Sequence, residues 1–410
     1  MNRFIPNLPS AFLLSTLLLP LCLPVISHGH PRNNFVRTIG KNFVLNGRPL
    51  YVNGFNSYWM MWVASDPTQR HEVTSVFKEA AAHGLNVART WAFNDGSGYH
   101  ALQTSPGVYD EQVFQGLDFV IVEAQKHAIR LILSFVNNYK DFGGRAQYVQ
   151  WGRNETRLNI SSEDDFYTSP IVKKYYKNHV NRIVTRNNSL SGIAYKEDPT
   201  IFSWELINEP RCETDPSGRT VQNWVQEMAG YVKSLDSNHL VEVGMEGFYG
   251  ESVPKRKKFN PNGNEIGTDF ITTNQLPGID FATVHSYPDA WLASSDEKAQ
   301  LLFLKRWMKV HIKDANRVLK KPILFSEFGK SYKDPGYNIT QRDRFYKIVY
   351  KNIYKAAKSG KAGGGGLLWQ LMAQGMKSLA DGYEIVLSQS PSSTAALISS
   401  QSKRLISLRF

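Results

Sequence analysis

Two glutamates carry the first sign of chemistry in this sequence. Glu209 follows a run of β-branched and aromatic residues and comes directly after Asn208, and Glu327 follows a second apolar run over residues 322–326. Each is expected at the carboxyl end of a buried strand. Two such carboxyl groups can serve as the acid and the nucleophile or base of glycoside hydrolysis. The alternative for either glutamate alone is a solvated strand terminus.

A cation and two hydrogen-bonding groups could support this pair. Arg89 ends another predicted strand and would keep Glu327 ionised and correctly aimed, as a nucleophile requires. His285 and Tyr287 are two positions apart, so on one strand they point to the same side. We expect Tyr287 to donate to the nucleophile and His285 to lie near the acid. Taken singly, each could equally be an ordinary core residue.

Tryptophans near the predicted strand ends could form sugar subsites. Trp369 follows a run of glycines and apolar residues, and Trp91 and Trp151 lie at a strand end and in a long loop. A flat indole can cover the apolar face of a pyranose ring. Core packing is the alternative for each of them.

The elements that must position these residues alternate between strand and helix. Strands are predicted at residues 50–56, 86–93, 129–136, 201–209, 240–245, 281–287, 322–327 and 366–371. Helical patterns lie between them at residues 71–83, 111–127, 170–185, 220–235, 296–319 and 341–358. This order predicts an α/β fold with a single (β/α)8 TIM barrel, whose catalytic groups sit at the carboxyl ends of the strands. The helices after the fifth and eighth strands are not evident from the sequence.

Three further segments complete the predicted domain. Asn46-Gly47 between apolar residues indicates an N-terminal hairpin, which could plug the amino end of the barrel. Extended loops over residues 137–169 and 246–278 are expected on the catalytic face. The serine-rich tail from residue 388 is predicted to form an amphipathic closing helix, with a disordered tail as the alternative.

The amino terminus indicates secretion. Residues 1–29 form an apolar, proline-broken stretch with Arg3 as the only charge, typical of a secretory signal peptide, and residues 30–410 form the predicted catalytic domain with its tail. Cys22 lies in the signal, so Cys212 alone remains, expected as a buried free thiol, and no internal disulfide can form. Four Asn-x-Ser/Thr sequons are glycosylation candidates: Asn154, Asn159, Asn187 and Asn338.

Charge and motif content narrow the partners. Removing Arg3 with the signal lowers the net charge from +12 to 12 − 1 = +11, so nonspecific adhesion to acidic wall polymers is expected. The basic run at residues 255–258 is interpreted as a solvated loop, and neither a nucleic acid nor a membrane partner is expected. No His-x-x-x-His pair, Cys-x-x-Cys pair or phosphate-binding glycine loop occurs, so no metal and no cofactor are predicted.

The candidate residues together resemble the active-site set of glycoside hydrolase family 5. That set is Arg89, Asn208, Glu209, His285, Tyr287, Glu327 and Trp369. The segments 54–59, 89–93, 204–212 and 381–385 are similar to those of the plant endo-β-1,4-mannanases of the family, and the resemblance extends from Phe35 to about Leu387.

The resemblance implies a retaining enzyme with Glu209 as acid/base and Glu327 as nucleophile. Asn208 would hold the sugar 2-hydroxyl, and Arg211 and Trp151 would lie on the leaving-group side. The implied function is a secreted, monomeric endo-hydrolase of cell-wall mannan, glucomannan and galactomannan. The alternatives are an endo-β-1,4-glucanase of the same family and a catalytically silent carbohydrate-binding wall protein.

Overall fold

One compact unit comprises Asn34–Phe410. The computed structural model describes residues 1, 34–155, 160–389 and 393–408. Apart from Met1, the predicted signal peptide lies outside the described residues, as do Cys22 and the sequon at Asn159. Among the described helices, none is both long enough and apolar enough to cross a membrane.

Eight parallel strands form the central sheet, as predicted. Their spatial order is β10-β9-β8-β5-β4-β13-β12-β11. The strands are β4 (Val52–Asn56), β5 (Val87–Trp91), β8 (Arg130–Ser134), β9 (Ile201–Glu205), β10 (Leu240–Glu242), β11 (Ala282–Ser286), β12 (Ile323–Phe328) and β13 (Gly365–Leu368). The two outer strands, β10 and β11, are joined by hydrogen bonds from Asp280 N to Val241 O (2.8 Å) and from His285 N to Glu246 O (3.0 Å). These bonds close the sheet into a barrel.

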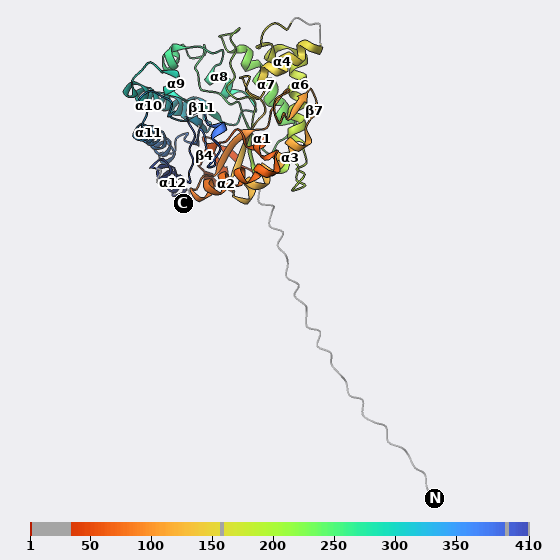
Figure 1. The fold of residues 1–410 in the computed structure, drawn as a ribbon. Helices are drawn as coiled ribbons and strands as arrows, with labels where there is room; N and C mark the ends of the chain where they lie inside the picture. Colours follow the sequence, from red (N-terminus) through yellow and green to blue (C-terminus); the bar gives the residue numbers. More distant parts are fainter. Residues whose placement is uncertain (2–33, 156–159, 390–392, 409–410) are drawn as a thin grey trace. The chain divides into compact units, whose positions relative to one another are not determined.

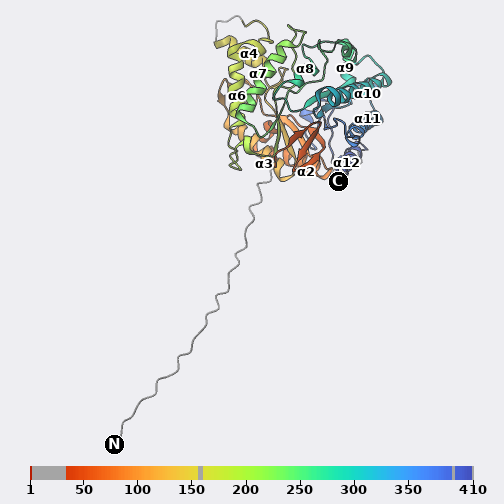
Figure 2. The same ribbon diagram turned by 180° about the vertical axis from the view of Figure 1, so that it is seen from behind.

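Helices surround the strands (Figure 1). They are α1 (Met60–Ala64), α2 (Arg70–Ala82), α3 (Glu111–Lys126), α4 (Gly144–Glu155), α5 (Asp165–Thr168), α6 (Pro170–Val184), α7 (Arg219–Leu235), α8 (Phe270–Gln275), α9 (Pro288–Trp291), α10 (Glu297–Asp314), α11 (Ile339–Lys358) and α12 (Ser393–Ile406). Every predicted helix is present, although the one predicted over residues 296–319 ends as a π-helical turn, Ala315–Leu319. After the fifth and eighth strands, where no helix was evident between strands, the structure has the short α8 and the closing helix α12 predicted for the tail. Seen from behind, α10, α11 and α12 follow one another along one side (Figure 2).

The predicted N-terminal hairpin packs against the amino end of the barrel. It belongs to an antiparallel sheet of β1 (Arg37–Ile39), β2 (Asn42–Leu45) and β3 (Arg48–Leu50). Asn46 and Gly47 have φ of 53° and 76°, as a type I′ turn requires. Phe43 is fully buried, with its ring centroid 5.1 Å from that of Phe202 and 5.0 Å from that of Phe281. The hairpin therefore fills the interior at the end opposite the candidate site.

The last helix joins the domain rather than trailing from it. Ile398 and Leu405 of α12 are buried. The side chain of Asn53, in the first barrel strand, donates to Ile398 O (3.1 Å) and to Ser402 Oγ (2.8 Å). The helix alternative for the tail is confirmed over the described residues 393–406.

The loops at the carboxyl ends of the strands are extended, as predicted. The loop after β8 contains α4 and α5, and the loop after β10 contains two 3₁₀ turns, Pro254–Phe259 and Pro261–Gly263. A further small hairpin, β6 (Gln103–Ser105) with β7 (Val108–Tyr109), follows β5.

Candidate active site

A cavity of about 420 Å³ lies at the carboxyl ends of the barrel strands. Its lining contains most of the residues singled out in the sequence: Trp91, Asn208, Glu209, Arg211, Tyr287, Glu327 and Trp369. Arg89 and His285 are fully buried directly beneath it. The barrel has thus brought together side chains from five strands or strand extensions.

Glu209 and Glu327 face each other in this cavity. Glu327 lies within β12, whereas Glu209 stands four residues beyond the end of β9 with a positive φ of 51°. The extension is held to the neighbouring strands, with Asn208 N donating to Val136 O and Glu209 N donating to Gly244 O, each at 2.9 Å. An oxygen of each carboxyl group and a ring nitrogen of His285 all lie within 4.8 Å of one another. This spacing fits the roughly 5–5.5 Å between the carboxyl groups of retaining glycosidases better than the roughly 6.5–9.5 Å of inverting ones.

Arg89 connects the nucleophile candidate to the barrel interior. Its Nη1 donates to Glu327 Oε1 (2.6 Å) and to Asn56 Oδ1 (3.0 Å), and its Nη2 donates to Asn208 Oδ1 (2.7 Å). Nε and Nη2 also donate to the two oxygens of Glu205, at 2.6 and 2.7 Å. All five N–H groups of the guanidinium are therefore used. A fully paired, fully buried Arg89 cannot rotate without breaking several charge-assisted bonds.

Tyr287 and His285 complete the surroundings of Glu327. The hydroxyl of Tyr287 donates to Glu327 Oε2 at 2.7 Å. His285 Nδ1 lies 2.5 Å from Glu209 Oε1 and 3.5 Å from Glu327 Oε2. Burial lowers the pKa of His285, so this imidazole is neutral at neutral pH.

Burial also raises the pKa of both candidate glutamates. It raises the pKa of Glu209, although Arg211 and a hydrogen bond from Tyr139 act in the opposite direction. It raises the pKa of Glu327, although the Arg89 charge and the Tyr287 hydrogen bond oppose that rise. Of Glu209 and Glu327, only Glu327 accepts a bond from Arg89, so we assign the first ionisation of this pair to Glu327.

Arg211 borders the side of the cavity near Glu209. It forms a two-bond ion pair with Glu246 (2.9 and 2.7 Å), and its guanidinium lies 5.7 Å from the centroid of the Tyr139 ring. Burial and the nearby Glu209 raise the pKa of Glu246 to about 7.

The aromatic wall is built around Trp369. Its ring stacks on Tyr58 at a centroid distance of 5.7 Å and an interplanar angle of 12°, and its Nε1 donates to Asp381 Oδ2 at 2.6 Å. Trp91 lies 6.3 Å away and covers the Arg89 guanidinium at 4.8 Å. Such a wall offers both a flat apolar face and polar edges to a sugar chain.

Trp151 does not line the cavity. It lies on α4, is 9 % exposed, and packs in the core against Tyr148 at a centroid distance of 5.2 Å. The core alternative therefore describes Trp151 better than a sugar-binding role. The remaining sequons that the structure describes, Asn154, Asn187 and Asn338, are all exposed.

Several residues of this site were not found in the sequence. Glu205, Asn56, Glu246, Tyr139 and Asp381 all contribute to it. The one available signal was Glu205, a charged residue inside an otherwise apolar strand. The others are polar residues at strand ends or in loops, where such residues are common.

A metal ion has little room here. His285 with Glu209 and Glu327 is the one cluster of described residues whose ligand atoms converge closely enough to hold a cation. Those atoms are already bonded to one another, to Arg89 and to Tyr287. The Arg89 charge does here what a cation would do.

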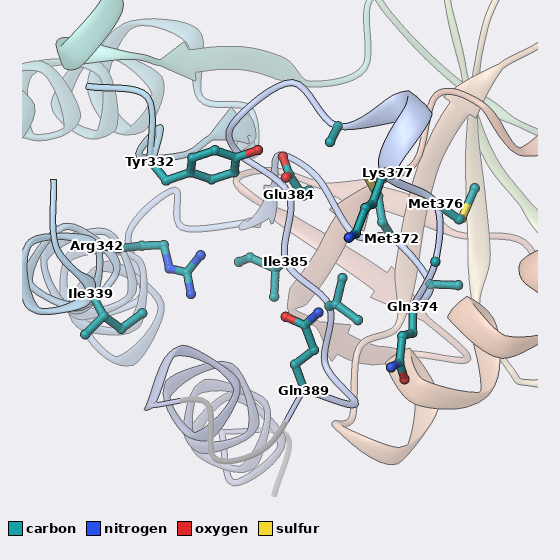
Figure 3. A pocket seen from close by; sticks show the side chains of 14 residues that line it. Tyr332, Ile339, Arg342, Met372, Gln374, Met376, Lys377, Glu384, Ile385 and Gln389 are labelled. Carbon is teal, nitrogen blue, oxygen red and sulfur yellow. The ribbon is translucent and has the colours of Figure 1, made fainter. Parts of the chain in front are cut away.

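A second cavity, of about 920 Å³, lies between the start of α11 and the segment 372–389 (Figure 3). The Tyr332 hydroxyl and the Glu384 carboxylate point toward one another across its rim and are hydrogen-bonded. Arg342 extends from α11, where its Nε donates to Thr394 Oγ1 at 3.1 Å. This cavity contains neither of the two candidate glutamates.

Comparison with known proteins gives consistent matches. The family described as "GH family 5 beta-mannosidase-like" matches residues 33–381. Mannan endo-1,4-beta-mannosidase 1 of Oryza sativa subsp. japonica is 58 % identical over 372 residues, which cover 90 % of this chain and 86 % of the relative. Mannan endo-1,4-beta-mannosidase 7 of Arabidopsis thaliana is 57 % identical over 379 residues, covering 92 % and 87 %. The endo-beta-1,4-mannanase of Thermotoga petrophila superposes with a TM-score of 0.75 at 32 % identity, covering 88 % of this chain and 78 % of that one.

Proposed function

Because the chain belongs to the β-mannosidase-like group of glycoside hydrolase family 5, we propose that it hydrolyses internal β-1,4-mannosidic linkages with retention of configuration. Its substrates are mannan, glucomannan and galactomannan of plant cell walls. The similarity to plant mannan endo-1,4-beta-mannosidases over about nine-tenths of the chain supports this substrate class. The observation that carries the chemistry is the close approach of Glu209 and Glu327 above Arg89.

In the first step, Glu327 attacks the anomeric carbon while Glu209 protonates the leaving oxygen. Arg89 and Tyr287 each bond to one oxygen of Glu327, so the carboxylate is aimed and its charge is balanced. Burial raises the pKa of Glu209, which favours the protonated form that an acid needs. The result is a covalent glycosyl-enzyme and a free leaving chain.

In the second step, water takes the place of the leaving chain. With the first sugar bound covalently, Glu209 is ionised and removes a proton from that water, which attacks the anomeric carbon and releases Glu327. The side chain of Asn208 is fixed by Arg89 and by a 3.0 Å bond to Asn137 Oδ1. Asn208 holds the sugar 2-hydroxyl, and that contact tightens in the transition state.

The rest of the cavity binds the chain on either side of the cleaved bond. Trp369 and Trp91 supply the apolar floor for the sugar at the cleavage point. Arg211, beside Glu209, binds the leaving-group side. Since Trp151 lies in the core, it takes no part in this binding scheme.

The setting of the enzyme is also part of the proposal. The enzyme is secreted to the cell wall and acts as a monomer. It is glycosylated at one or more of the exposed sequons and adheres to acidic wall polymers through its net positive charge. The apolar leader supports secretion, the exposed sequons support glycosylation, and the net positive charge supports the adhesion.

Hydrolysis of mannan and of cellulose, assayed side by side, tests the function. We expect mannan to be cut with a rapid fall in viscosity, because cleavage is internal, while cellulose stays intact. Cleavage of cellulose with intact mannan would identify an endo-β-1,4-glucanase instead. Binding to either polymer without release of sugar ends would identify a silent carbohydrate-binding protein.

A further inference from the structure

One buried carboxyl group close to the site has no role in the mechanism above. Glu242 lies on β10 and pairs in register with Glu205 of the neighbouring β9. Both side chains are fully buried. Burying two carboxyl groups side by side in the barrel interior costs free energy unless each is neutral or paired with a charge and hydrogen-bonded.

The strand holds Glu242 tightly against its neighbour. Gly244 N donates to Glu242 Oε2 at 2.5 Å, and Gly244 has a φ of 90°. A Cβ on Gly244 would lie 2.1 Å from Ile207 O and 2.9 Å from Glu205 Cδ. Only glycine can occupy this position, so the backbone at Gly244 packs directly against the Glu205 side chain.

The other oxygen of Glu242 has no donor facing it. Among the described residues, no N–H or O–H group donates to Glu242 Oε1, and the Glu242 and Glu205 carboxyl groups lie within hydrogen-bonding reach of each other. Two carboxylates cannot hydrogen-bond to each other unless one of them carries a proton. Glu205 already accepts two bonds from Arg89, so the proton belongs to Glu242.

Charge balance favours the same assignment. Arg89 is shared by Glu205 and Glu327, so these three groups already carry a net charge of −1 when both glutamates are ionised. Burial and the nearby Glu205 charge raise the pKa of Glu242 well above its usual range. Burial alone would raise the pKa of Glu205, but Arg89 and the bond from Glu242 outweigh it and lower that pKa.

We propose that Glu242 is a positioning residue that stays protonated and donates to Glu205, thereby fixing the Glu205–Arg89 pair that in turn holds the nucleophile Glu327. The proposal rests on the proposed function, since it assigns Glu327 that role. In it, Glu242 touches neither the substrate nor the reacting atoms. Its effect reaches Glu327 through the fixed Arg89 guanidinium.

Two substitutions of Glu242 with side chains of similar size separate the effect of its hydrogen-bond donor from that of its volume. In Glu242→Gln the amide donates to Glu205 and its oxygen accepts from Gly244, so kcat/KM on mannan should stay within about twofold of wild type, with an unchanged pH profile. In Glu242→Met the donor is lost. The unshared Glu205 charge then raises the pKa of Glu327, so the acid limb should move to higher pH and kcat/KM should fall about tenfold.

Two outcomes overturn the proposal. If Glu242→Gln loses as much activity as Glu242→Met, an ionised carboxylate is required at this position. If Glu242→Met has the kcat/KM of wild type and an acid limb at the same pH, Glu242 does not position the Glu205–Arg89 pair.

An infrared measurement tests the protonation without any assay. The spectrum of wild type minus that of Glu242→Gln should contain the carbonyl stretch of a protonated carboxylic acid at neutral pH, whether or not the protein cleaves mannan. A carboxylate band in its place would overturn the proposal. Failure of the proposed function would instead appear as wild-type protein that lacks mannan hydrolysis. If Glu242→Met does not fold, the Gln variant and the infrared band still decide.

Discussion

His285 touches both catalytic glutamates, with Nδ1 2.5 Å from Glu209 Oε1 and 3.5 Å from Glu327 Oε2. Because burial lowers the pKa of His285, the ring adds no charge to the pair. The asymmetry between the glutamates therefore comes from their other partners. Arg89 and Tyr287 both donate to Glu327, whereas none of the five Arg89 N–H groups donates to Glu209. One carboxyl group is prepared to be ionised and the other to keep its proton.

Tyr287→Phe should shift the acid limb of the pH profile. The Tyr287 hydroxyl donates to Glu327, and a bond to the ionised form lowers the pKa of the acceptor. Its removal should raise the pKa of Glu327, so that the acid limb of kcat/KM moves to higher pH. A hydrogen bond to a charged group is worth roughly 1.5–3 kcal/mol, so kcat/KM should fall about tenfold or more.

Tyr383→Phe is the matched control. Its ring centroid lies 5.2 Å from that of Tyr287 and it lines the same cavity, but the structure gives it no hydrogen bond to Glu327. Its acid limb should stay in place. An unmoved limb in Tyr287→Phe would show that this hydroxyl does not control the nucleophile.

Glu209→Gln should stabilise the fold at neutral pH. Burial raises the pKa of Glu209 in the folded state above that of the unfolded chain, about 4.3 for a glutamate. The folded state therefore binds this proton more strongly than the unfolded chain does. The free energy of unfolding of the wild type falls as pH rises from the unfolded pKa to the higher folded pKa. Glutamine does not ionise, so the variant lacks this loss of stability. Its melting temperature should be a few degrees above that of the wild type at about pH 7 and equal to it at about pH 4.

Thermal unfolding of Glu213→Gln at the same two pH values provides the control. Glu213 is exposed in the same loop. Its variant should track wild type at both pH values. A gap in Glu209→Gln that is the same at both would mean that packing, not ionisation, is responsible.

The sequence predicted the barrel and its glutamate pair because strand ends carry a local signal. Apolar runs that end in a carboxylate mark residues 201–209 and 322–327, and the barrel brings such ends together. The predicted strand reached Glu209, whereas the regular ladder stops at Glu205 and the backbone turns to a positive φ at Glu209. Side-chain geometry at a strand end depends on neighbouring strands, which a local pattern does not contain.

The buried contacts of Arg89 with Glu205 were not predicted from the sequence for the same reason. The partner of Glu205 is Arg89, 116 positions earlier in the chain, and the two meet only after the sheet has formed. Trp151 shows the opposite error. Its place in a long loop suggested a sugar platform, but that loop folds into α4 and turns the ring into the core.

Ile398→Ala should show that the tail helix stabilises the barrel. Ile398 is fully buried, and its carbonyl accepts a bond from Asn53 of the first barrel strand. Truncation of such a side chain removes apolar burial and leaves a cavity, at a cost of about 2–5 kcal/mol in the free energy of unfolding. Urea unfolding measures this. Ser400→Ala, at an exposed position of α12, should change it by less than about 0.5 kcal/mol. Equal values for the two variants would mean that α12 contributes nothing.

The roles of the two glutamates can be separated by the products of rescued variants. Glu209→Ala and Glu327→Ala should both nearly abolish mannan hydrolysis, so activity alone cannot assign them. An activated aryl β-mannoside needs little acid assistance, and azide needs no general base. With both supplied, Glu209→Ala should still form the glycosyl-enzyme on Glu327 and regain turnover, giving a β-mannosyl azide.

Glu327→Ala cannot form that intermediate. Azide can act there only from the vacated nucleophile side, in a single displacement, and the product must be the α-mannosyl azide. The anomer that each rescued variant forms, determined by NMR, is therefore the deciding measurement. The bonds from Arg89 and Tyr287 to Glu327 assign it the role of nucleophile, so we expect β from Glu209→Ala and α from Glu327→Ala. Exchanged anomers would reverse the assignment, and full mannan cleavage by either variant would exclude a mechanism that needs both glutamates.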